Sequence, residues 1–151
     1  LNCVAKQPEI LLKKKAPIII TPHPGEMSRL TGLATPLVNA ERERVALDFA
    51  QKYGVVTVLK GAGTVIASPN GKVLVNPTGN SGMATGGSGD VLAGMTASIL
   101  AQGASAFSSA AAAVYLHGLA GDIAAEKYGK ISMLPTDLIN CIPLAYKRCG
   151  F

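Results

Sequence analysis

Two short runs of consecutive apolar residues constrain the fold more than any other feature of the sequence. Residues 18–20 and 55–59 are almost wholly Ile, Val and Leu, a pattern typical of strands that are buried on both faces. Residues 64–67 and 72–75 flank Asn70-Gly71, and an Asn-Gly pair between β-rich segments predicts a hairpin. Strands combined with helical segments predict a layered α/β domain.

Helical segments are expected between and after these strands. The two prolines in residues 21–25 exclude a helix in that turn, so a helix is predicted to begin at Glu26. Asn39 is the predicted N-cap of a helix that reaches Lys52, and Gly54 ends it. Three further helices are expected over residues 89–102, over the alanine-rich residues 104–125, and from Pro135 onward.

The composition limits the class of protein. With 151 residues, of which 48% are hydrophobic, the chain can bury the core of one domain, predicted over residues 1–151. Three cysteines cannot complete a disulfide framework, so a reducing, cytoplasmic setting is expected. The net charge of +5 comes with only 5% aromatic residues and no Trp, which favours small anions over nucleic acid. His117 and Asp122 in the alanine-rich segment favour a packed helix over a membrane span.

The glycine-rich residues 76–89 carry the strongest indication of chemistry. Small residues let backbone N–H groups approach a ligand, and the helix that follows offers unsatisfied donors with a partial positive charge. Such a turn binds phosphate. No Gly-Lys-Ser/Thr sequence closes a Walker A loop here, and Gly87-Ser88-Gly89 does not continue as the dinucleotide G-x-G-x-x-G pattern.

Asp90 lies at the start of the predicted helix and has two interpretations. Its carboxylate could cap the first helical turn, a contribution of about 0.5–2 kcal/mol. A carboxylate beside phosphate donors competes with the anion, however, so its position is poorly explained by stability. A general base that takes a proton from a hydroxyl attacking phosphorus needs this proximity, and we favour that role.

Three separated motifs carry a resemblance to a known family. Gly86-Gly-Ser-Gly-Asp90 before a helix resembles the anion-hole motif of the ribokinase-like superfamily. The longer glycine-rich string from Asn76, together with Thr21-Pro-His-Pro-Gly-Glu26 and Lys60-Gly-Ala-Gly-Thr64, resembles the ADP-dependent NAD(P)H-hydrate dehydratases. The resemblance implies a ribokinase-like three-layer α/β/α sandwich, of which the N-terminal part is expected to be missing here.

The resemblance also implies an activity. It indicates a lyase that restores NADH or NADPH from the hydrated forms NADHX and NADPHX, uses ADP and releases AMP and phosphate. Asp90 would contact the hydrated ring and act as base, His23 would contact the substrate, and Mg²⁺ would be held by phosphates and water, without a metal cluster of protein ligands. The implied ADP-binding residues are Lys60, Gly61, Ala62, Gly63, Thr64, Asn80, Ser81, Gly82, Met83, Ala84, Thr85, Gly86, Gly87, Ser88 and Gly89.

Several of these residues have a purely structural alternative. His23 could be an ordinary loop residue or a capping donor, and Lys60 a solvated charge at a strand end. Glu26 could cap or complement the charge of the helix it begins, and is a weak site candidate. His117 is expected to be packed and hydrogen-bonded rather than a ligand.

Two other functions stay open at this point. Gly-Ser-Gly-Asp also fits a small-molecule kinase of the same superfamily, of the hydroxymethylpyrimidine or hydroxyethylthiazole type. A non-catalytic nucleotide-binding fragment is the third possibility. A homo-oligomer without membrane or nucleic-acid partners is expected, with a functional link to an NAD(P)H-hydrate epimerase. The preference for NADHX or NADPHX is not specified by these residues.

Overall fold

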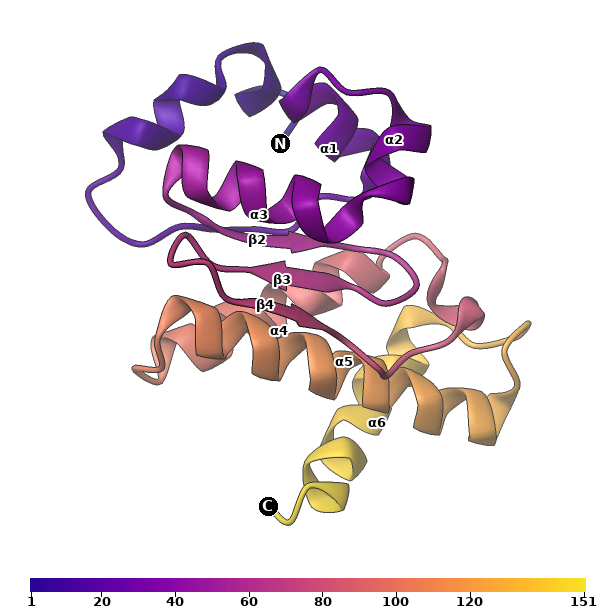
Figure 1. The fold of residues 1–151 in the computed structure, drawn as a ribbon. Coiled ribbons are helices and arrows are strands. Elements are labelled where there is room, and N and C mark those ends of the chain that lie inside the picture. Colours follow the sequence, from indigo (N-terminus) through magenta and orange to yellow (C-terminus); the bar gives the residue numbers. More distant parts are fainter. The chain divides into compact units, whose positions relative to one another are not determined.

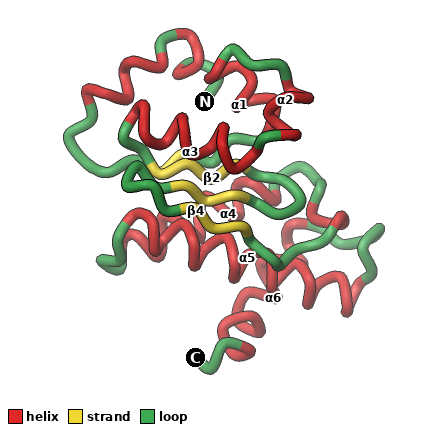
Figure 2. Tube along the Cα trace, in the orientation of Figure 1, coloured by secondary structure: helices red, strands yellow, loops and turns green.

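The chain folds into two compact units. The computed structural model describes residues 1–151, and the units comprise Leu1–Val75 and Asn76–Phe151. All the strands belong to the first unit, whereas the second contains only helices and connecting loops (Figure 2). The prediction of one domain over the whole chain stays a prediction.

The strands of the first unit form one four-stranded sheet, in the order β1-β2-β3-β4, with the helices of this unit on one face (Figure 1). β1 and β2 are parallel, and the other neighbours are antiparallel, with Leu59 opposite Val65 and Val65 opposite Val75. Every residue of β2 is buried, as the apolar run 55–59 predicts, and every residue of β3 is buried as well. In β1 only Ile20 is buried and Ile19 is half-buried, so the prediction for the first run holds only in part. The strands are β1 (Ile19–Ile20), β2 (Val56–Leu59), β3 (Val65–Ala67) and β4 (Val73–Val75).

Helix α3 supplies much of the core that covers this sheet. Its buried residues include Val45, Ala46, Phe49 and Ala50, which lie at helical spacing and pack against β2 and β3. Met27 of α1 and Val38 of α2 join the same cluster. The helices of this unit are η1 (Val4–Lys6) and η2 (Pro8–Lys13), both of the 3₁₀ type, α1 (Pro24–Thr31), α2 (Thr35–Ala40) and α3 (Arg42–Tyr53).

The predicted strands and hairpin are confirmed, but two helix starts were wrong. α1 begins at Pro24 rather than Glu26, because proline has no N–H to satisfy in the first turn and its φ already suits a helix. Asn39 lies inside α2 instead of capping a long helix, since α2 already starts at Thr35, with Pro36 in its first turn. The chain then leaves the helical conformation at Glu41 (φ −126°, ψ 42°), and α3 follows.

The second unit is built around α5. This helix packs against both α4 and α6, and its buried positions are mostly Ala and Gly, which allow close helix contacts. The three predicted helices are confirmed, with Pro135 in the first turn of α6. None of the helices combines the length and apolar character needed to span a membrane. The helices are η3 (Ser81–Met83, 3₁₀), α4 (Ser88–Ala101), α5 (Ala106–Tyr128) and α6 (Pro135–Arg148).

Gly54 and Gly32 offer a matched test of how helices end in the first unit. Both are left-handed C-caps, with φ of 65° and 76°. A Cβ on Gly54 would lie 2.7 Å from Lys14 Nζ, which donates to the Tyr53 carbonyl at 2.8 Å, whereas a Cβ on Gly32 meets nothing within 4 Å. In both alanine variants, backbone strain lowers the free energy of unfolding by about 1–2 kcal/mol. We expect Gly54→Ala to lower it by about 1 kcal/mol more, because the new Cβ displaces Lys14 and breaks its hydrogen bond to Tyr53. Urea unfolding of both variants measures the difference in the free energy of unfolding. Equal decreases in the two variants would contradict the contribution of the Lys14 hydrogen bond.

Candidate functional site

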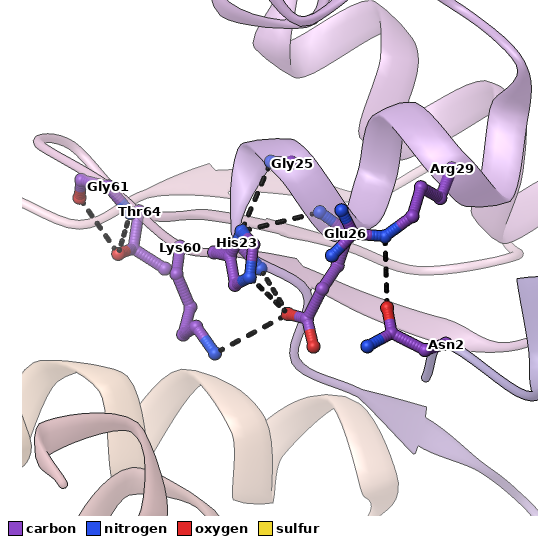
Figure 3. Close-up of polar contacts among 8 residues, drawn as sticks. All are labelled: Asn2, His23, Gly25, Glu26, Arg29, Lys60, Gly61 and Thr64. Carbon is purple, nitrogen blue, oxygen red and sulfur yellow. Dashed lines mark hydrogen bonds and ion pairs between the residues drawn. The ribbon is translucent and has the colours of Figure 1, made fainter. Parts of the chain in front are cut away.

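His23 caps helix α1 where the chain leaves β1. Its Nδ1 accepts hydrogen bonds from the backbone N–H groups of Gly25 (3.1 Å) and Glu26 (3.3 Å), as Figure 3 shows. Because Nδ1 acts as acceptor, the neutral ring carries its proton on Nε2. The ring therefore caps as an acceptor, not as the capping donor considered from the sequence, and its exposed edge keeps an N–H group.

Glu26 completes this cap and gathers two further groups. One carboxylate oxygen, Oε2, accepts from the His23 backbone N–H at 2.9 Å and lies 3.5 Å from His23 Nε2 and 4.0 Å from Lys60 Nζ (Figure 3). The reciprocal pair is a capping box, so the predicted capping role of Glu26 is confirmed. The same carboxylate holds His23 and Lys60 together, a role that a simple cap does not have.

Lys60 reaches this place because β1 and β2 are parallel. Parallel neighbours end at the same edge of a sheet, and the Lys60 backbone N–H donates to the Pro22 carbonyl at 2.9 Å. The motifs of residues 21–26 and 60–64, far apart in sequence, therefore lie side by side within the first unit (Figure 3). Concave sites of α/β proteins form at the carboxyl ends of parallel strands.

The loop after Lys60 is a tight turn closed by Thr64. The Thr64 hydroxyl donates to the Gly61 carbonyl at 3.1 Å and accepts from the Gly61 N–H at 3.4 Å. Gly61 and Gly63 have φ of 147° and 63°, values that favour glycine. Ala62 at the tip is exposed. The nucleotide-binding role of these residues stays a prediction.

Arg42, which the sequence analysis did not identify, fastens this loop from α3. Its Nη2 donates to the Leu59 carbonyl at 2.8 Å and lies 3.5 Å from the Gly63 carbonyl, and a Cβ on Gly61 would be 2.7 Å from Nη1. Partial burial lowers the pKa of the Arg42 guanidinium from its ordinary value, because desolvation disfavours the charged form. No sequence signal separates Arg42 from Arg44, which forms an exposed ion pair with Glu41.

In the second unit, the end of the glycine-rich segment presents free backbone donors. Gly87 is the N-cap of α4 with φ of 99°. The Gly87 carbonyl accepts from the N–H groups of Asp90 (3.0 Å) and Val91 (3.1 Å). The backbone N–H groups of Gly86, Gly87 and Gly89 have no acceptor within the chain. Unpaired donors at the positive end of a helix are suited to binding an anion. Phosphate binding by this turn stays a prediction.

The Asp90 carboxylate is exposed beside these donors. It occupies the third position of α4, yet the start of this helix has no side-chain cap, and Asp90 accepts no hydrogen bond. Asp137 occupies the same position of α6 and does cap, since its Oδ2 accepts from the Leu134 N–H at 2.8 Å. The capping interpretation of Asp90 is therefore not supported by the geometry.

His117 supports the start of α4 from α5. It is 8% exposed, and its Nε2 lies 2.9 Å from the Ser88 carbonyl oxygen. Because a carbonyl oxygen can only accept a hydrogen bond, Nε2 carries a proton and donates it. The expected packed and hydrogen-bonded histidine is confirmed. The Ser88 hydroxyl is also buried and has no hydrogen-bond partner.

Comparison with known proteins assigns the chain to a family. The family model described as NAD(P)H-hydrate dehydratase matches residues 1–144. The chain belongs to this family. It is 46% identical over 148 residues to the bifunctional NAD(P)H-hydrate repair enzyme Nnr of Moorella thermoacetica, covering 98% of this chain and 28% of that protein. It is 38% identical over 136 residues to the ADP-dependent (S)-NAD(P)H-hydrate dehydratase of Bacillus subtilis, covering 90% of this chain and 49% of that protein.

Solved structures confirm the predicted ribokinase-like α/β fold for this dehydratase family member. The Bacillus subtilis ADP/ATP-dependent NAD(P)H-hydrate dehydratase, co-crystallised with ATP/Mg²⁺, superposes with a TM-score of 0.84 at 38% identity, covering 87% of this chain and 48% of that chain. A ribokinase-like superfamily protein of Enterococcus faecalis gives 0.76 at 36% identity, covering 89% of this chain and 46% of that chain. The chain thus spans about half the length of the Bacillus subtilis dehydratase.

Glu26 provides a direct test of the capping box. Removing its carboxylate takes the acceptor from the His23 N–H, so we expect Glu26→Ala to lower the free energy of unfolding by about 1 kcal/mol. The matched control is Glu41→Ala, which removes only an exposed ion pair with Arg44, worth about 0–1 kcal/mol at most. Chemical denaturation of both variants measures the losses. A Glu26→Ala loss no larger than that of the control would contradict the geometry.

Proposed function

We propose that the protein dehydrates hydrated NADH and NADPH to the functional reduced dinucleotides, consuming ADP and forming AMP and phosphate. The observation that carries the proposal is the exposed, unpartnered Asp90 beside the unpaired N–H groups of Gly86, Gly87 and Gly89. Membership of the NAD(P)H-hydrate dehydratase family supports the same substrate class. An anion site with an adjacent free carboxylate suits proton removal next to phosphorus.

The reaction proceeds in two balanced steps. In the first, the ring hydroxyl oxygen bonds to the β-phosphorus of ADP, the bond from that phosphorus to the bridging oxygen breaks, and AMP leaves. Asp90 takes the hydroxyl proton. In the second step, the carbon–oxygen bond breaks and its electron pair leaves with phosphate. The neighbouring ring carbon gives a proton to water, and the electron pair of that carbon–hydrogen bond restores the ring double bond. Phosphorylation turns a poor leaving group, hydroxide, into a good one.

The backbone donors are suited to the first step. In phosphoryl transfer, negative charge spreads over the equatorial oxygens of the moving group, and fixed donors stabilise that charge. The N–H groups of Gly86, Gly87 and Gly89 require no side chain to be ordered when the anion binds. Residues 80–85 of this unit are further proposed nucleotide-binding residues. In the first unit, the loop from Lys60 to Thr64 is likewise proposed to bind nucleotide.

His23 is the proposed contact to the hydrated nicotinamide ring. Its Nδ1 is occupied by the cap of α1, so only the Nε2–H can donate to a substrate oxygen, which would share that N–H with Glu26 Oε2 at 3.5 Å. Glu26 keeps the ring in this orientation through Oε2. A histidine whose orientation is set by its own helix cap is a rigid donor.

Magnesium enters with the nucleotide. No three His, Cys, Asp or Glu side chains come together as a metal site, so phosphates and water are the proposed main ligands of Mg²⁺. The Bacillus subtilis relative was co-crystallised with ATP/Mg²⁺, which supports a magnesium–nucleotide complex as the species bound here, with ADP as the proposed co-substrate. The relatives named as bifunctional repair enzymes support a functional link to an epimerase of the same hydrates. A cytoplasmic homo-oligomer is part of the proposal.

The deciding assay measures absorbance at the reduced-nicotinamide band with hydrated NADH, Mg²⁺ and either ADP or ATP. The chain is assayed alone and together with the region of the Bacillus subtilis dehydratase that it does not cover. We expect NADH to be recovered with one AMP and one phosphate per turnover when ADP is used. A stable phosphorylated alcohol would indicate a kinase, and nucleotide binding without turnover in either form would indicate a non-catalytic binder.

Asp90→Asn tests the proposed base against a matched control. Because the amide cannot take the hydroxyl proton, we expect turnover to fall by at least about 100-fold with nucleotide affinity changed little. Asp137→Asn alters the equivalent position of α6, where the carboxylate caps the helix, so it should leave turnover unchanged and lower stability by about 0.5–1 kcal/mol. Steady-state kinetics and thermal unfolding of both variants give the comparison. Similar turnover in the two variants would remove Asp90 from the mechanism.

A further inference from the structure

Asp122 on α5 binds the first half of the glycine-rich segment with both carboxylate oxygens. Oδ2 accepts from the Gly79 backbone N–H at 2.9 Å, and Oδ1 accepts from Asn80 Nδ2 at 3.0 Å. These partners lie more than 40 residues earlier in the chain, so the contact is tertiary and contributes nothing to α5 itself. Asp is an unfavourable residue in a helix interior, and here it interrupts an alanine-rich helix.

The contact passes through Asn80 to the next turn. Asn80 Oδ1 accepts from the Gly82 N–H at 3.0 Å, and Nδ2 also donates to the Gly121 carbonyl at 3.0 Å. The amide of Asn80 is therefore fixed from both sides. Its orientation sets the start of η3, whose residues lie within the proposed nucleotide-binding range.

Two glycines of α5 let the segment lie directly against the helix. A Cβ on Gly118 would meet the backbone carbonyl carbon of Thr78 at 2.8 Å, and a Cβ on Gly121 would meet Met83 Cγ at the same distance. The Thr78 hydroxyl donates to the Tyr115 carbonyl at 2.9 Å. This close approach brings the Gly79 N–H within reach of Asp122.

We propose that Asp122 is a positioning residue of the nucleotide site, which acts by fixing the backbone of Gly79 and Asn80 before the nucleotide arrives. The inference rests on the proposed nucleotide-binding role of the segment that begins at Asn80. Gly79 has φ of 101°, and a glycine-rich segment without a fixed partner samples many conformations. If such a segment became ordered only when the nucleotide bound, the loss of conformational entropy would weaken affinity. A segment already held by Asp122 binds without that entropic cost. The paired N–H donors also compensate the negative charge of Asp122.

The test compares three variants of α5. Asp122→Ala removes both acceptors, and Asp122→Asn keeps one. Glu126→Gln, one turn later, alters a carboxylate that pairs only with Arg148 on the exposed surface, at 2.8 Å. Isothermal titration with Mg·ADP and Mg·ATP measures Kd. We expect Asp122→Ala to raise Kd by about tenfold or more, Asp122→Asn to lie between, and Glu126→Gln to stay within about twofold of wild type.

Amide hydrogen exchange supplies the second readout. Exchange at Gly79 and Gly82 should accelerate in Asp122→Ala while the core of α5 keeps its protection, because the lost bonds are local. When the chain is assayed together with the uncovered region of the Bacillus subtilis dehydratase, Asp122→Ala should raise the KM for nucleotide more than it lowers kcat. If Asp122→Ala does not fold, Asp122→Asn decides on the same measurements.

The outcomes separate this inference from the proposed function. Wild-type binding together with unchanged Kd in the Asp122 variants overturns the positioning role and leaves the proposed function intact. Wild-type protein that binds neither nucleotide overturns both. Faster exchange at Gly79 with unchanged Kd makes the contact a structural one only and also overturns the inference.

Discussion

The close approach of the glycine-rich segment to α5 is the constraint on which the second unit depends. Gly118 and Gly121 leave room for the backbone of the segment, and Asp122 then binds its N–H donors. At the far end, His117 of the same helix binds the Ser88 carbonyl where α4 starts. One stretch of α5 thus holds both ends of a segment that is too rich in glycine to hold a shape alone.

The first unit solves a similar problem with a different interaction. Its two loops follow parallel neighbouring strands, and the Glu26 carboxylate joins them by contacting both His23 and Lys60. Arg42 of α3 fixes the second loop through the backbone carbonyls of Leu59 and Gly63. In both units a charged side chain acts on the backbone or side chains of a loop, and the loop residues carry the proposed chemistry.

Much of the fold could be predicted from the sequence because the signals are local. The apolar runs at β1 and β2, the Asn-Gly turn and the start of α6 at Pro135 each depend on a few neighbouring residues. The break between α2 and α3 at Glu41 could not be predicted from helix caps alone. Asn39 is a residue type that favours an N-cap, but it lies inside α2, which starts earlier with Pro36 in its first turn. The motif residues could also be identified from their immediate neighbours in the sequence. Arg42 and Asp122 instead bind partners 17 and 43 residues away, and no sequence pattern around them indicates those partners.

The proposed function depends on binding of the nucleotide's phosphate chain by the unpaired N–H groups at the start of α4. The most direct measurement is the change in amide chemical shifts of the isotopically labelled chain when Mg·ADP is added. We expect the largest saturable changes at Gly86, Gly87 and Gly89, where the donors have no acceptor within the chain. Saturable binding that leaves these three amides unchanged, with the changes confined to other residues, would contradict it.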